Sequence, residues 1–270
     1  MSAEASASGR FIEVDQATLY VEDRGLGAPL ILLHGGLSSS ATWAAMLPHL
    51  VEEFRVITPD SRGHGRSTNA AGTLSYAQLA DDVAALIAAL GVAPPVVGGY
   101  SDGGQVALEL GARHPQAASA LIVGAAYPEF VDSGLRDVFR AVLGADEAGA
   151  PDLAQVDALL GDAAELVKSR HPGGPEQWRA LVEQTAPMWL DYPGLTPEEL
   201  GAIDAPVLLF TGDRDGLIPL ELIVSLYRAL PDAELAVAPN TDHIGAMMPE
   251  RAELVAGVIR DFAARRTSPG

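Results

Sequence analysis

Residues 99–103 read Gly-Tyr-Ser-Asp-Gly, so a serine stands between small residues in the pattern G-x-S-x-G. An apolar strand is expected just before this turn, over residues 96–99, and a helix just after it, over residues 104–113. A strand that turns directly into a helix strains the middle residue, and larger flanking side chains would collide. This context favours a nucleophile over a glycine-rich turn that happens to contain serine. The hydroxyl of Ser101 is therefore predicted to project above the end of a sheet, beside the amide of Asp102.

A serine hydroxyl is a weak nucleophile and needs a base, which in turn needs an acid to orient it. Among the six histidines, His243 alone follows the last predicted strand. The loop after the preceding strand contains Asp213 and Asp215. We favour Asp215 as the acid because it lies deeper in the loop, and interpret Asp213 as a turn residue. Glu129, shortly after another predicted strand, is a third candidate.

Only a sheet whose strands end at one edge could bring these side chains together. Strand-like runs occupy residues 11–14, 18–22, 29–33, 54–58, 96–99, 120–123, 207–210 and 235–238. The first two are expected to form a hairpin, and the others alternate with helical stretches. The clearest helix is expected to begin after Ser75 and to end at Gly91. The sequence thus predicts an α/β protein with a mostly parallel, eight-stranded sheet and helices on both faces.

The alternation stops between residues 126 and 200, which contain no strand-like run and carry a net charge of −9. Helical pieces are expected at residues 153–167 and 176–183, with breaks at several prolines that include Pro187. We interpret residues 126–200 as a helical cap on a core made of residues 10–125 and 201–265, with disordered tails at 1–9 and 266–270. Thr196, followed by Pro197 and two glutamates, predicts a capped helix start that leads back to the sheet.

Composition excludes several classes of partner. The 270 residues carry a net charge of −19, so phosphate backbones and anionic lipid surfaces would repel the chain, and neither nucleic acid nor membrane is expected as a partner. The uncharged stretch of residues 83–101 is interrupted by glycines and prolines that lipid would not tolerate. Without cysteine there is no disulfide scaffold or thiolate site. Residues 1–9 lack the features of a secretory signal, so a cytoplasmic protein is expected. The oligomeric state is not indicated.

Five motifs in this order resemble the α/β-hydrolase superfamily, and the resemblance runs from Phe11 to about Arg265. They are His34-Gly35-Gly36, residues 60–67 (DSRGHGRS), the Ser101 turn, the Asp215 loop and the His243 loop. The resemblance implies an oxyanion hole whose first donor is the amide of Asp102 and whose second is that of Gly36, with Leu37 as a further candidate. It also implies structural roles for His34 and His64.

The mechanism that this resemblance implies is ester hydrolysis through an acyl-enzyme. The turn Ser101-Asp102-Gly103-Gly104 is also similar to that of biphenyl-hydrolase-like esterases, some of which cleave α-amino acid esters and use this acid to engage the amine. Asp102 and the acidic insertion favour neutral or cationic small-molecule substrates. The alternative for Asp102 is that its carboxylate stabilises the helix N-terminus. No pattern for a metal, flavin or nucleotide is present, so the chemistry is expected to need no cofactor.

Aromatic and methionine side chains are candidates for an apolar pocket between core and insertion, and fewer than half are expected to touch substrate: Trp43, Tyr100, Tyr127, Phe130, Met188, Trp189, Met247 and Met248. Two other functions remain open. In one, Ser101, Asp215 and His243 keep their roles but act on a different bond of the substrate, as in a lactonase, a C–C bond hydrolase or a perhydrolase. The other is a non-catalytic ligand-binding or biosynthetic accessory protein, which the presence of all three side chains disfavours.

Overall fold

The computed structural model describes residues 8–128 and 134–267, and within them eight strands form one sheet. The strand order is β1-β2-β4-β3-β5-β6-β7-β8. The strands are β1 (Ser8–Val14), β2 (Ala17–Arg24), β3 (Ala28–Leu33), β4 (Phe54–Pro59), β5 (Val96–Tyr100), β6 (Ala120–Gly124), β7 (Val207–Gly212) and β8 (Ala233–Ala238). The pairs β1–β2 and β2–β4 are antiparallel, and the other five are parallel. The predicted fold class is confirmed.

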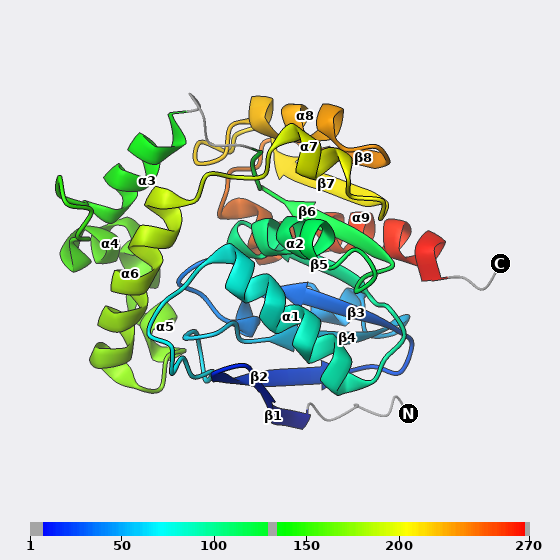
Figure 1. Cartoon of the computed structure of the whole chain (residues 1–270), viewed down its shortest axis with the longest axis horizontal. Helices are drawn as coiled ribbons and strands as arrows, with labels where there is room; N and C mark the ends of the chain where they lie inside the picture. The colour runs from blue at the N-terminus through cyan, green and yellow to red at the C-terminus, as the bar shows by residue number, and fades with distance from the viewer. Residues whose placement is uncertain (1–7, 129–133, 268–270) are drawn as a thin grey trace.

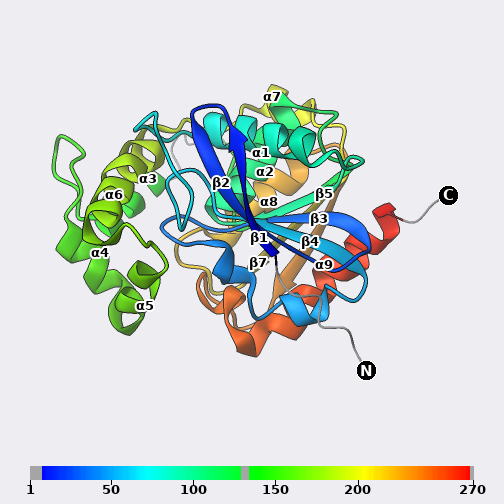
Figure 2. The same cartoon turned by 90° about the horizontal axis from the view of Figure 1, so that it is seen from below.

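Helices cover both faces of the sheet. In Figure 2, α1 (Tyr76–Leu90) and α2 (Asp102–Arg113) lie on one face, and α9 (Ala252–Thr267) lies on the other. The connections near the β7 and β8 edge contain α7 (Pro197–Gly201) and α8 (Leu220–Ala229). Because both faces are covered, β5 and β6 consist of buried residues throughout, as their continuous apolar runs predict.

Local sequence signals set the ends of two helices. The hydroxyl of Ser75 accepts a hydrogen bond from the N–H of Gln78 at the start of α1, and Gly91 ends that helix with φ +60°. At the start of α7, Thr196 and Glu199 form a reciprocal capping box. Both predicted starts are confirmed, because a cap depends only on residues three positions apart.

The segment between β6 and β7 contains α3 (Leu135–Leu143), α4 (Leu153–Leu160), α5 (Ala164–Ser169) and α6 (Gly174–Asp191), which lie together at one side of the molecule (Figure 1). The predicted break at Pro187 is wrong, because this proline lies inside α6. A proline in a helix interior costs about 3 kcal/mol. The next three side chains, Met188, Trp189 and Leu190, are buried, and each contributes about 1.5–3 kcal/mol when fully buried. Their burial offsets the free-energy cost of the proline.

The predicted tails are wrong for residues 8–9 and 266–267, which lie in regular elements, and the rest of both tails lies outside the described residues. Ser8 and Gly9 pair with β2 as part of β1, and α9 continues to Thr267 rather than stopping at residue 265. The hairpin ladder joins Ser8 to Asp23 and Gly9 to Glu22. In the last turn of α9, the guanidinium of Arg266 forms an ion pair with Glu234 at 3.1 Å.

The uncharged stretch of residues 83–101 is divided between α1, β5 and the turns that flank them. None of the helices in the described parts of the chain is long and apolar enough to cross a membrane. The cytoplasmic location stays a prediction.

Candidate active site

Ser101 stands between β5 and α2 with a positive φ of +57°, a conformation that side chains rarely adopt. A Cβ added to Gly99 would lie 2.2 Å from the backbone of Gly103, and one added to Gly103 would lie 2.2 Å from the carbonyl oxygen of Leu33. Only glycine fits at these two positions, which is the physical content of the G-x-S-x-G pattern. The Ser101 side chain is partly exposed above β5.

Three side chains from separate loops form one hydrogen-bonded series. His243 Nε2 lies 3.1 Å from Ser101 Oγ, and His243 Nδ1 lies 2.8 Å from Asp215 Oδ2. Ser101 and His243 are 142 positions apart in the sequence, so the parallel sheet has brought them to one edge. The arrangement has the order of nucleophile, base and orienting acid that activation of a hydroxyl requires.

The structure places Asp215, and not Asp213, against the imidazole. The second oxygen of Asp215 accepts hydrogen bonds from the amides of Leu217, at 3.0 Å, and Ile218, at 2.8 Å. Asp213 instead accepts a hydrogen bond from the amide of Thr241, at 3.2 Å, and so holds the loop that leads to His243. The third candidate, Glu129, lies outside the described residues.

The two predicted oxyanion donors, the amides of Gly36 and Asp102, belong to segments next to Ser101. The structure records no hydrogen bond for the N–H of Gly36 or of Asp102 among the residues that it describes. A Cβ added to Gly35 would lie 3.3 Å from Cβ of Ser101, so this loop packs directly against the nucleophile. The amide of Asp102 opens α2, where the helix dipole favours an anion.

Leu37 is wrong as an oxyanion donor. Its N–H donates a hydrogen bond to His64 Nε2 at 3.2 Å and is therefore not available to a substrate. Sequence reasoning missed this bond because His64 belongs to another loop, 27 positions away.

The buried imidazoles of His34 and His64 hold the loops around the oxyanion site. His34 Nδ1 donates to the carbonyl of Gly35 at 2.7 Å, while its Nε2 accepts from the amide of Ser61 at 2.9 Å. His64 Nδ1 likewise donates to a carbonyl, that of Arg62, at 3.0 Å. These partners assign a neutral ring to each histidine. Burial lowers the pKa of both imidazoles, which favours the same neutral form.

The carboxylate of Asp102 has partners that local sequence could not indicate. It accepts hydrogen bonds from the hydroxyl of Tyr76, at 2.8 Å, and from the indole N–H of Trp189, at 3.0 and 2.9 Å. Burial raises the pKa of Asp102, and the bonds from Trp189 and Tyr76 act in the opposite direction. The donors lie 87 and 26 positions away in the sequence, so no short motif connects them to Asp102.

The residues predicted to line a substrate pocket lie in different parts of the structure. Trp43 is wrong, because it is 0% exposed within the hydrophobic core and leaves no surface for a substrate to touch. Tyr100 is buried, and its ring lies 5.2 Å from that of His243 and 5.3 Å from that of Phe210. Phe130 lies outside the described residues.

The remaining candidates come from the segment between β6 and β7 and from the loop after His243. Tyr127 packs near Phe139 and Tyr192, with ring centroids 6.0 and 6.1 Å apart. Met188 is buried on α6, Met247 is partly buried, and Met248 is 45% exposed. Two of the described candidates contact the site directly: Trp189 donates a hydrogen bond to Asp102, and the ring of Tyr100 lies beside that of His243. The pocket itself stays a prediction.

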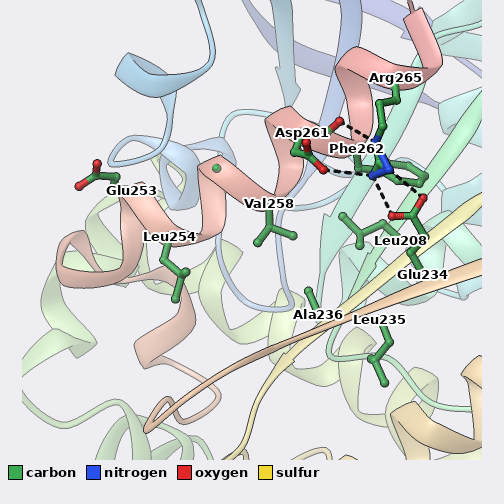
Figure 3. Close-up of a pocket in the computed structure, with 11 residues that line it drawn as sticks. Leu208, Glu234, Leu235, Ala236, Glu253, Leu254, Val258, Asp261, Phe262 and Arg265 are labelled. Atoms are coloured by element: carbon green, nitrogen blue, oxygen red, sulfur yellow. Dashed lines mark hydrogen bonds and ion pairs between the residues drawn. The ribbon is translucent and has the colours of Figure 1, made fainter.

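A groove of about 430 Å³ lies elsewhere, between β8 and α9 (Figure 3). Glu234 and Arg265 form an ion pair at 2.8 Å along its wall, next to apolar side chains such as Val258. None of Ser101, Asp215 and His243 lines this groove. It is therefore separate from the site described above.

Within residues 8–128 and 134–267, no three histidine, aspartate or glutamate side chains are grouped so as to hold a metal ion. The acid of the site, Asp215, is already engaged by an imidazole and two amides. Chemistry without a cofactor stays a prediction.

The profile of a protein family described as the alpha/beta hydrolase fold matches residues 28–247. The chain belongs to the α/β-hydrolase family. The match includes the segments that contain Gly36, Ser101, Asp215 and His243. The predicted family resemblance is thus confirmed.

Two relatives of this α/β-hydrolase are named as a hydrolase and as an esterase. The chain is 25% identical over 259 residues to the 2-(acetamidomethylene)succinate hydrolase of Mesorhizobium japonicum, covering 89% of this chain and 91% of the relative. It is 29% identical to the pimeloyl-[acyl-carrier protein] methyl ester esterase of Nitrosospira multiformis, covering 85% and 92%. This α/β-hydrolase is accordingly an enzyme.

Among solved structures, this α/β-hydrolase is similar to a thermophilic esterase from Thermogutta terrifontis. The TM-score is 0.79 at 24% identity, and the match covers 97% of this chain and 100% of the other. At that identity the likeness is one of fold.

Proposed function

We propose that this α/β-hydrolase cleaves carboxylic esters of small to medium, neutral or cationic, apolar substrates through an acyl-enzyme. The observation that carries the proposal is the hydrogen-bonded series from Ser101 through His243 to Asp215. The relative from Nitrosospira multiformis, named a methyl ester esterase, supports the bond type.

In the first half of the reaction, Ser101 Oγ attacks the ester carbonyl while His243 Nε2 takes its proton. Asp215 stabilises the imidazolium that forms. The carbonyl oxygen becomes negative and accepts hydrogen bonds from the amides of Gly36 and Asp102. As the tetrahedral intermediate collapses, His243 returns the proton to the leaving alkoxide, and the alcohol departs from an acyl-serine.

The second half repeats these roles with water as the nucleophile. His243 takes a proton from water as its oxygen attacks the acyl carbonyl, and the same two amides stabilise the second oxyanion. The imidazolium then protonates Ser101 Oγ as the acyl bond breaks. The carboxylic acid leaves, and the free enzyme is restored.

The substrate class follows from charge near the site. Asp102 is a buried carboxylate, and an oxygen of its side chain would lie 2.4 Å from a Cβ added to Gly36. An anionic acyl group in this place would meet the carboxylate in a medium that screens charge poorly. The cap carries a further net charge of −9. Both observations favour neutral or cationic substrates.

Labelling by a fluorophosphonate tests the nucleophile. We expect covalent modification of the native protein at Ser101, seen by mass spectrometry, and none in Ser101→Ala, because the alanine variant has no hydroxyl to attack phosphorus. Turnover on a panel of p-nitrophenyl esters, lactones and β-diketones then identifies which type of bond the enzyme cleaves. A native protein that is neither labelled nor active on any ester would refute the proposal.

The charge preference is tested with p-nitrophenyl esters of matched size that bear an amino, an alkyl or a carboxylate group on the acyl part. We expect kcat/KM to be lowest for the carboxylate ester. Asp102→Asn, which keeps an acceptor for Tyr76 and Trp189 but removes the charge, is expected to relieve that discrimination. Equal turnover of aminoacyl and acyl esters would remove the case for recognition of an amine, and equal turnover of all three would refute charge selection.

A further inference from the structure

A side chain of the cap reaches the nucleophile turn through Asp102. The indole N–H of Trp189, on α6, donates to both oxygens of this carboxylate at 3.0 and 2.9 Å, and the hydroxyl of Tyr76, on α1, donates at 2.8 Å. Trp189, Asp102 and Tyr76 are 9%, 8% and 1% exposed. The carboxylate therefore has little access to water and depends on these two donors.

The side chains of Asp102 and Trp189 also pack against Gly36, whose amide has no recorded hydrogen-bond partner among the described residues. A Cβ added to Gly36 would lie 2.4 Å from Asp102 Oδ2 and 2.5 Å from Trp189 Cζ2. If the indole N–H were lost, one buried oxygen would lack a donor. The amides of Gly36 and of Asp102 itself would then be nearby donors for that oxygen.

We propose that Trp189 is a positioning residue that keeps the oxyanion hole open by holding the carboxylate of Asp102 away from the amide of Gly36. This inference rests on the proposed function and deepens it. Without the indole N–H, the carboxylate turns towards the amides or opposes the negative charge that develops on the substrate oxygen. Either effect slows formation of the tetrahedral intermediate more than it weakens substrate binding.

The same helix offers a matched control. Trp178 is also a buried tryptophan of α6, 4% exposed, but its indole N–H has no hydrogen-bond partner among the described residues. Trp178→Phe and Trp189→Phe remove the same atoms, and only the second removes a hydrogen bond. The two variants thus separate the bond from the volume of the indole ring.

The experiment measures, in the full-length chain, the rate of fluorophosphonate labelling at Ser101 and the kcat and KM for p-nitrophenyl acetate. We expect Trp189→Phe to lower the labelling rate and kcat by about tenfold or more, with KM changed less than about threefold. Trp178→Phe should leave all three within about twofold. Thermal melting of both variants verifies that they fold.

A double-mutant cycle with Asp102→Ala tests whether Trp189 acts through the carboxylate. In the Asp102→Ala background there is no carboxylate to hold, so Trp189→Phe should change the labelling rate less than about twofold. If Trp189→Phe alone is unstable, the comparison of Asp102→Ala with the double variant still tests the inference. A large effect of losing the indole in that background would show that Trp189 does not act through the carboxylate.

Three results would overturn the inference: Trp189→Phe labelled as fast as the native protein, an effect confined to KM, or an equal effect in both backgrounds. An effect confined to KM would make Trp189 a wall of the substrate pocket. If the native protein is neither labelled nor active on any ester, the proposed function fails and this inference fails with it. If the native protein and Trp189→Phe are labelled equally fast, the proposed function stands and only this inference fails.

Discussion

Asp213 and Asp215 stand two positions apart and make different contacts. The side chain of Asp215 is fully buried, with one oxygen on His243 and the other on two amides. The side chain of Asp213 is 35% exposed and accepts a hydrogen bond from the amide of Thr241. The sequence favours Asp215 by its depth in the loop alone, whereas the structure shows which carboxylate meets the imidazole.

Asparagine at each position separates these roles. In Asp215→Asn, the amide that replaces the carboxylate can no longer stabilise the imidazolium, and we expect kcat for an ester substrate to fall by about 10⁴-fold. Asp213→Asn keeps an oxygen for the amide of Thr241, so kcat should stay within about fivefold of the native value. Steady-state kinetics with p-nitrophenyl esters measures both. Similar losses in the two variants would contradict the assignment of Asp215 as the acid.

At the scale of elements, two glycines inside helices have opposite surroundings. Gly111, in α2, faces the sheet, and a Cβ there would lie 2.6 Å from Leu121 and 3.2 Å from Ile203. Gly257, in α9, has nothing within 4 Å of an added Cβ. Glycine at position 111 allows α2 to approach β6 closely, while position 257 carries only the entropic cost of glycine in a helix.

Alanine substitution should therefore shift stability in opposite directions. Gly257→Ala is expected to raise the free energy of unfolding by about 0.5–1 kcal/mol, because alanine restricts the unfolded chain and clashes with nothing. Gly111→Ala is expected to lower it by about 1–3 kcal/mol through overpacking against β6. Urea denaturation followed by circular dichroism compares the two. A stabilised Gly111→Ala would show that the α2 and β6 interface can expand at little cost.

Over the whole molecule, buried histidines make stability depend on pH. Burial lowers the pKa of His34 and, more strongly, that of His64. Below the unfolded-state pKa of about 6.5, the unfolded chain binds protons that the native rings do not. Their contribution to stability is therefore complete above that pH and is lost progressively as the pH falls below it.

We expect the Tm of the native protein to fall between pH 7 and pH 5, and part of this fall to disappear in His64→Gln. Comparison with that variant is needed because burial raises the pKa of buried carboxyls such as Asp102, and their contribution to stability changes with pH in the opposite direction. His49→Gln, at an exposed position, is the matched control. Differential scanning fluorimetry from pH 5 to pH 8 measures all three proteins. Identical pH profiles for native and His64→Gln would refute a role for His64.

Structural features that depend on residues close in sequence could be predicted in detail. Ser75 and Gly91 bound α1 as expected, and the glycines around Ser101 indicate the turn, because capping and tight turns involve neighbours along the chain. The prediction was wrong at Pro187, where burial of the residues that follow outweighs a local preference. It was also wrong at Leu37, whose amide is taken by His64.

The sequence by itself determined the α/β class, the family and the order of nucleophile, acid and base, since these follow from periodicity and from short motifs. Only the tertiary structure decided which aspartate meets His243, which amides stay free for an oxyanion, and that Trp189 holds Asp102. The physical reason is that a hydrogen bond requires two atoms to lie within about 3 Å in a suitable direction. For partners 28 to 142 positions apart, that condition depends on how whole elements pack.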